Sequence, residues 1–92
     1  MEYNFNNEDL KKTILSLFNG ISRSILEDNL EIKVGELFIW LKWSFKFKYN
    51  DKIYTYSRIA RSDITKEELA GVIARKIASK TNWELKINED KN

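Results

Sequence analysis

The sequence predicts an α+β fold, a two-layer sandwich in which a small antiparallel sheet packs on two helices. Residues 37–61 alternate in polarity about a central Asn-Asp pair, which is typical of a β-hairpin. Apolar side chains recur at helical spacing before and after it, over 7–28 and 65–80. A last alternating segment at 83–87 predicts a short strand, so the expected order is α-β-β-α-β.

The first predicted helix spans residues 7–28 and is capped by Asn6 or Asn7; residues 1–6 precede it as an arm or short strand. Gly20 lies inside the pattern and costs about 1 kcal/mol relative to alanine, which marks a kink. The apolar face continues in phase past this glycine, so we expect a single helix. That face is formed by Leu10, Ile14, Leu17, Phe18, Ile21 and Ile25.

The hairpin is predicted to join strands at 37–49 and 52–61 through a turn centred on Asn50-Asp51, with an extended segment at 30–34 leading into it. Asn and Asp tolerate the positive φ that two-residue hairpin turns require. The cross-strand pairs are then Tyr49–Lys52, Phe47–Tyr54, Phe45–Tyr56 and Trp43–Arg58. A slip of one residue would place lysines among the aromatic side chains, so the pattern favours this register. The predicted core face consists of Leu41, Trp43, Phe45, Phe47, Tyr54 and Tyr56.

The second helix, residues 65–80, has the clearest start signal in the chain. Thr65 and Glu68 form a capping box, and Ile64 and Leu69 flank it as a hydrophobic staple. Its apolar face is predicted to consist of Leu69, Val72, Ile73 and Ile77.

This element order is related to the α-β-β-β-α order of the double-stranded-RNA-binding fold. In that family the second helix begins with a lysine-rich phosphate clamp. Here residues 62–68 read SDITKEE, which is acidic, so we do not assign the chain to that family.

Length and composition bound the functional classes. The 92 residues suit a single domain, 1–92, with a polar tail at 88–92. The longest apolar run, Leu37–Leu41, is far shorter than the ~20 residues of a membrane helix, and the polar start is no secretory signal. We therefore expect a cytoplasmic protein that does not bind membranes. Because histidine and cysteine are absent and the glycines are isolated, we expect no enzyme activity, no metal site and no cofactor.

The hairpin face opposite the core carries an apolar patch with a cationic rim, at the end remote from Asn50-Asp51. Exposed aromatic side chains of this size indicate a covering element, a partner or a ligand, and Trp and Arg are enriched at interface hot spots. The leading hypothesis is a protein-binding module, an inhibitor or regulator. The alternatives for Trp40 are cover by residues 1–6 or by a helix, or burial in a homodimer. The predicted partner-binding residues are Phe38, Trp40, Lys42, Ile59 and Arg61.

A nucleic-acid-binding module is the second hypothesis. Residues 37–61 hold six basic side chains against the carboxylate of Asp51, a net charge of +5 in a chain of net charge +2. Lysines between aromatic residues on a sheet can neutralise phosphates while rings stack on bases, although strand lysines also deter aggregation. The nucleic-acid contacts would come from Lys42, Lys46, Lys48 and Arg61, with Trp40 as the stacking side chain.

The composition is rich in Asn, Lys, Ile, Asp and Glu and contains no Pro, Cys or His. It resembles that of short proteins encoded by AT-rich bacterial genomes and their phages. Phage inhibitors of host defence, anti-CRISPR proteins among them, are often of this size and lack enzymatic motifs. This resemblance, in size and composition only, implies an inhibitor of a host protein complex.

Overall fold

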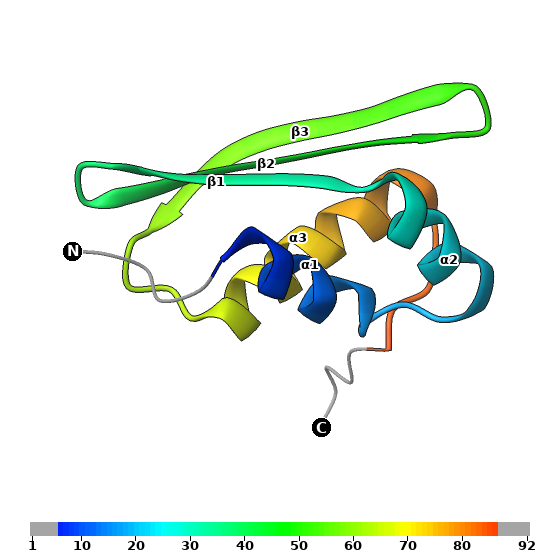
Figure 1. Cartoon of the computed structure of the whole chain (residues 1–92), viewed down its shortest axis with the longest axis horizontal. Helices are drawn as coiled ribbons and strands as arrows, with labels where there is room; N and C mark the ends of the chain where they lie inside the picture. Colours follow the sequence, from blue (N-terminus) through cyan, green and yellow to red (C-terminus); the bar gives the residue numbers. More distant parts are fainter. Residues whose placement is uncertain (1–5, 87–92) are drawn as a thin grey trace.

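The computed structural model describes residues 6–86 of the chain. This part forms two layers, a three-stranded antiparallel sheet and the helices that cover one of its faces (Figure 1). The elements are α1 (Asn7–Leu15), α2 (Gly20–Asn29), β1 (Glu31–Leu37), β2 (Trp40–Tyr49), β3 (Lys52–Arg61) and α3 (Lys66–Thr81). The predicted α+β fold is confirmed, with the order α-α-β-β-β-α in place of α-β-β-α-β. The predicted tail, Ile87 and all of the predicted arm except Asn6 lie outside the described residues.

The predicted helix over 7–28 is two helices, because the chain turns between α1 and α2. Gly20 adopts a φ of +56°, a backbone conformation that residues other than glycine rarely take. Before it, the backbone N–H groups of Leu17 and Phe18 bond three residues back, at 3.0 and 3.1 Å, which ends α1 in a tight turn. The break resets the helical phase, so Leu26 is buried whereas Ile21, predicted to be in the core, is 79 % exposed.

The predicted strand at 83–87 is not formed by the residues the structure describes, which reach Lys86. Asn82 ends α3 in the left-handed conformation, at φ 66. The chain then crosses the α1–α2 break, where the Lys86 N–H donates to the carbonyl oxygen of Leu17 at 2.8 Å. Trp83 packs on three rings of the core, those of Phe18, Phe47 and Tyr49. The alternating side chains of this segment therefore reflect packing on the core without a strand ladder.

The hairpin register is confirmed, and the strand boundary is corrected. Strands β2 and β3 pair from Tyr49–Lys52 to Trp40–Arg61, as predicted. The predicted strand over 37–49 begins at Trp40, because Leu37 ends β1 and a two-residue turn separates the two strands. Strand β1, which includes residues 31–34 of the predicted extended segment, pairs antiparallel with the other side of β2.

The core lies between the two layers. Helices α1 and α3 lie on the Trp43/Phe45/Phe47 face of the sheet, as predicted (Figure 1). All three rings are buried. Tyr54 and Tyr56 of β3 are half-buried at the edge of this core. The opposite face, which we call the open face, is covered by no helix of the described residues (Figure 1).

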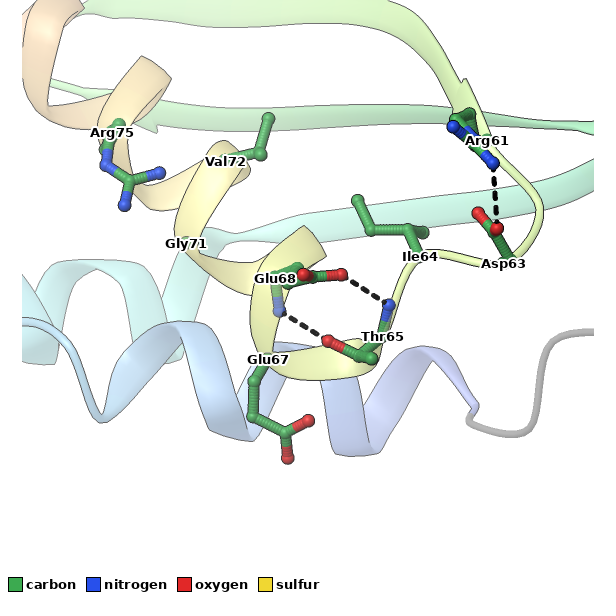
Figure 2. A pocket seen from close by; sticks show the side chains of 9 residues that line it. All are labelled: Arg61, Asp63, Ile64, Thr65, Glu67, Glu68, Gly71, Val72 and Arg75. Atoms are coloured by element: carbon green, nitrogen blue, oxygen red, sulfur yellow. Dashed lines mark hydrogen bonds and ion pairs between the residues drawn. The ribbon is translucent and has the colours of Figure 1, made fainter.

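Helix α3 begins as the sequence predicts. The N–H of Glu68 donates to Thr65 Oγ1, and the N–H of Thr65 donates to Glu68 Oε1, both at 3.1 Å (Figure 2). Its buried stripe differs from the prediction, because Val72 is 40 % exposed while Ala70 and Ala74 are fully buried. The small residues therefore mark the side of the helix that faces the core, and Val72 lies on the side toward β3.

Candidate functional site

The turn between β1 and β2 exposes an apolar segment of the chain. Phe38 and Ile39 form a two-residue turn, and Leu37 pairs with Trp40 across it. The exposed fractions of Leu37, Phe38, Ile39 and Trp40 are 46, 90, 69 and 39 %. We call these four residues the apolar tip. In Figure 1 the tip is the turn at the left of the sheet, and it extends past the ends of α1 and α3.

Phe38 has an unfavourable backbone conformation at the centre of this tip. Its φ is 58°, in the left-handed region that glycine, asparagine and aspartate tolerate and that bulky side chains rarely adopt. A residue held there costs on the order of 1–3 kcal/mol, and such outliers cluster at ligand clamps and other functional sites. The cost is not offset by packing of the ring, which is almost fully exposed.

Four of the five predicted partner-binding residues lie together on the open face. Trp40 pairs with Arg61, and the neighbouring pair is Lys42 with Ile59. Strand alternation predicted that Phe38 shares this face, and this prediction is wrong, because Phe38 lies on the turn itself. Trp40 and Ile59, 39 and 49 % exposed, connect the apolar tip to the open face.

The cationic rim is less free than the sequence suggests. Arg61 Nη2 lies 3.1 Å from Asp63 Oδ2, and both side chains are mainly exposed. Exposed ion pairs of this kind contribute about 0–1 kcal/mol, so Arg61 can exchange this carboxylate for one on a partner.

The predicted nucleic-acid residues form a row on the open face. Lys42, Lys46 and Lys48 are exposed on the same side of β2, and Arg61 lies on β3 opposite Trp40 at the tip end of the row. Strand β1 adds Lys33, which the sequence analysis missed because β1 was not assigned as a full strand. Glu31 pairs with Lys46 and reduces the positive charge of the row. Of the aromatic residues of the strands, only Trp40 is on this face, since the others pack toward the helices.

A second surface, which sequence analysis did not identify, lies where β3 passes α3. Exposed Val72 and half-buried Tyr56 are part of it. The Arg58 guanidinium donates to the Tyr56 hydroxyl at 2.9 Å, and Lys76 Nζ is 4.4 Å from the centre of the Tyr56 ring. The hydrogen bond from Arg58 and the nearby charges of Arg58 and Lys76 lower the pKa of Tyr56, against a smaller opposing effect of burial. The buried alanines of α3 could have revealed Val72, because they show which side of the helix faces the core.

Two further observations concern the described residues only. No helix among them is long and apolar enough to cross a membrane. No three carboxylates among residues 6–86 gather as a cation site would require.

Comparison with known proteins finds no matching family model, curated protein or solved structure.

Proposed function

We propose that the protein is a small, non-enzymatic protein-binding module that inserts its apolar tip into a hydrophobic pocket of a partner protein. The observation that supports this proposal is the exposure of four consecutive apolar residues, Leu37–Trp40, at a turn where Phe38 adopts a costly conformation. A polar turn would be more stable at this place and more soluble. A binding role accounts for both the exposed apolar residues and the costly conformation of Phe38, because binding needs these side chains exposed to the partner and held in one geometry.

The tip offers apolar surface that binding can bury. Full burial of a large apolar side chain contributes about 1.5–3 kcal/mol. Because the exposed fractions of Phe38, Ile39 and Trp40 are 90, 69 and 39 %, their remaining burial contributes roughly 3–6 kcal/mol together. Part of this gain is offset by the lost freedom of the two molecules. Polar contacts of Lys42 and Arg61 at the rim would then set orientation and association rate more than affinity. A Kd of 1 μM corresponds to about −8 kcal/mol, so a micromolar complex also needs contacts from the surface around the tip.

The resemblance in size and composition to phage inhibitors of host defence extends this proposal to the role of the partner. In that role the apolar tip would occupy a surface that a host complex needs for its own assembly or substrate. A homodimer through the tip is the competing arrangement, and it is decided by the same experiment.

Photo-crosslinking from the tip tests the proposal. A photoreactive phenylalanine analogue is placed at Phe38, and in a control at Ile21, which is 79 % exposed on α2. Crosslinking in cells should give a discrete partner band from position 38 and none from position 21, and Ile39→Thr should weaken it. A band at twice the mass of the chain identifies the homodimer. If positions 38 and 21 give the same diffuse products, the tip does not bind a specific partner.

A nucleic-acid-binding function is the second candidate, and the row of lysines on the uncovered sheet face favours it. Binding through phosphates weakens steeply between about 50 and 200 mM salt. Titration with single- and double-stranded oligonucleotides should then quench Trp40 fluorescence in a salt-dependent way, and Lys46→Glu should reduce it. An unchanged spectrum at low salt removes this candidate.

A further inference from the structure

Strand β3 is an edge of the sheet, and its outward backbone groups pair with no other strand of residues 6–86. The strand order β1-β2-β3 gives β3 one neighbour among the described residues. Beyond the end of β3, the Ser62 N–H donates to the Ile39 carbonyl oxygen at 3.2 Å. Since hydrogen-bonded and non-bonded pairs alternate along an antiparallel ladder, the residues of β3 whose backbone groups point outward are Ile53, Thr55, Ser57, Ile59 and Arg61. Such a row is a template for an added strand.

A groove runs beside this edge, between β3 and α3. Its volume is about 470 Å³, and its floor is apolar, with Trp43, Ile64 and Val72. Toward the start of α3 the groove continues into a wider depression that shares Ile64 and Val72. Figure 2 shows this end, where Ile64 and Val72 project toward the sheet. The groove therefore offers an apolar pocket directly beside the open backbone edge.

The charge of the groove is one-sided. Among the described residues, those that line the 470 Å³ groove include three basic side chains, Arg58, Arg75 and Lys76. No acidic residue lines it in this part of the chain. Lys80 extends the positive charge, because its Nζ is 5.3 Å from the centre of the Tyr56 ring. A side chain of an added strand that points into the groove near Tyr56 would therefore lie close to these cationic groups.

The carboxylates at the other end of the groove are already engaged or turned away. Asp63 pairs with Arg61, and Glu68 accepts from the Thr65 N–H. Glu67 points away from the sheet in Figure 2. Among the described residues, no carboxylate forms an ion pair with Arg58 or Lys76, the two cations beside Tyr56.

We propose that an acidic, extended segment of a partner protein adds to β3 as a fourth strand and lays alternate side chains into the groove beside α3. Main-chain hydrogen bonds to β3 supply part of the affinity, and the groove supplies specificity. The segment carries carboxylates where it passes Tyr56 and Arg58, and an apolar side chain where it passes Ala60 and Val72. This surface lies away from Leu37–Ile39 of the apolar tip, so either proposal can fail alone.

A second copy of the chain is a poorer occupant of this edge. Two β3 strands side by side would bring together Lys52, Arg58 and Arg61 of both copies, and β3 contains no acidic residue to offset them. Like charges opposite each other in a sheet are destabilising. Charge complementarity therefore selects an acidic segment over self-association.

A designed peptide tests strand addition without knowledge of the natural partner. The probe has eight residues, with threonine at every other position and two glutamates followed by two isoleucines at the remaining ones; its reversed sequence covers the other strand direction. One of the two should bind with a Kd below about 1 mM. Replacing the glutamates by lysines should weaken it at least about tenfold. Methylation of alternate backbone amides should abolish binding in one frame and leave it unchanged in the other.

Variants of the protein and hydrogen exchange locate the peptide. Arg58→Glu should weaken binding about tenfold, whereas Lys48→Glu, the same charge change on the open face, should change it less than about threefold. On binding, the amides of Ile53, Thr55, Ser57 and Ile59 should become protected from exchange. The proposal is overturned if neither peptide binds at low salt, if both methylation frames bind equally, or if protection appears elsewhere.

Discussion

The two turns at the ends of β2 have the same length and opposite chemistry. At one end Asn50 and Asp51 adopt φ 58 and 63, which both residue types tolerate, and they are polar and exposed. At the other end Phe38 adopts φ 58 with an exposed aromatic ring, followed by exposed Ile39. The first turn serves the stability of the hairpin, and the second lowers stability and exposes apolar surface. This difference is the reason for placing the proposed binding site at the Phe38 turn.

The surroundings of the two turns differ in the same direction. Near the polar turn, Trp83 packs on Tyr49 and Phe47 with ring centroids 5.1 and 5.8 Å apart. At the other turn Trp40 keeps 39 % of its surface exposed. One end of β2 is therefore completed by a tryptophan from elsewhere in the chain, and the other presents its own tryptophan to solvent.

The largest effect is expected from removing the tryptophan that covers the polar-turn end. Trp83→Ala should lower the free energy of unfolding by about 2–4 kcal/mol, because it deletes contacts with three core rings. Urea unfolding followed by circular dichroism measures the change. A loss below about 0.5 kcal/mol would mean that this segment does not stabilise the hairpin.

Exchanging the chemistry of the turns should have the next largest effect. The double substitution Asn50→Phe, Asp51→Ile places bulky residues at two positive φ values and should cost about 2 kcal/mol or more. The measurement is again urea unfolding, with Lys48→Ala as an exposed control. If stability is retained, the left-handed conformation is not costly in this sheet, and the strain inferred for Phe38 falls with it.

A smaller effect of opposite sign is expected at the apolar tip. Phe38→Asn should raise the free energy of unfolding by about 1 kcal/mol, since asparagine tolerates positive φ. It should also abolish crosslinking of Ile39 analogues to the partner. A variant that is both more stable and unable to bind shows a trade between stability and function at this position. Lower stability would show that the ring makes contacts that outweigh the strain.

The smallest perturbation compares the tryptophans in the intact fold. Acrylamide should quench the part of the tryptophan fluorescence that comes from exposed Trp40, and Trp40→Phe should remove most of this quenchable part. Trp83→Phe should leave it in place, since Trp83 is packed among rings. Equal quenching in both variants would show that Trp40 is covered in solution.

The elements that sequence analysis predicted well are those with a local signal. The Asn50-Asp51 turn and the alternation around it were sufficient for the register of β2 and β3, and the Thr65–Glu68 capping box located the start of α3. In each case the residue types that favour the structure are adjacent in the chain, so no tertiary information was needed.

The errors arise where tertiary contacts override a local pattern. The α1–α2 break was missed because Ile21 and Ile25 continue the helical period, whereas the conformation of Gly20 and the bond from Lys86 to Leu17 end it. The alternation around Trp83 predicted a strand, but its backbone bonds to a helix end. Four of the site residues were grouped correctly on one face. Phe38 was misplaced because nothing in the Phe-Ile sequence signals a turn. Val72 was predicted to be buried because the small residues that face the core carry little hydrophobic signal.

The hydrogen bond from Lys86 to Leu17 also sets an order of events during synthesis. Ribosomes add about 5–20 residues per second, so several seconds separate the emergence of the carbonyl at the α1–α2 break from that of its donor. During that interval the N-terminal helices wait without the segment that closes them and without the Trp83 ring over Phe18. The nascent chain therefore exposes this part of the core until Trp83 and Lys86 have been synthesised.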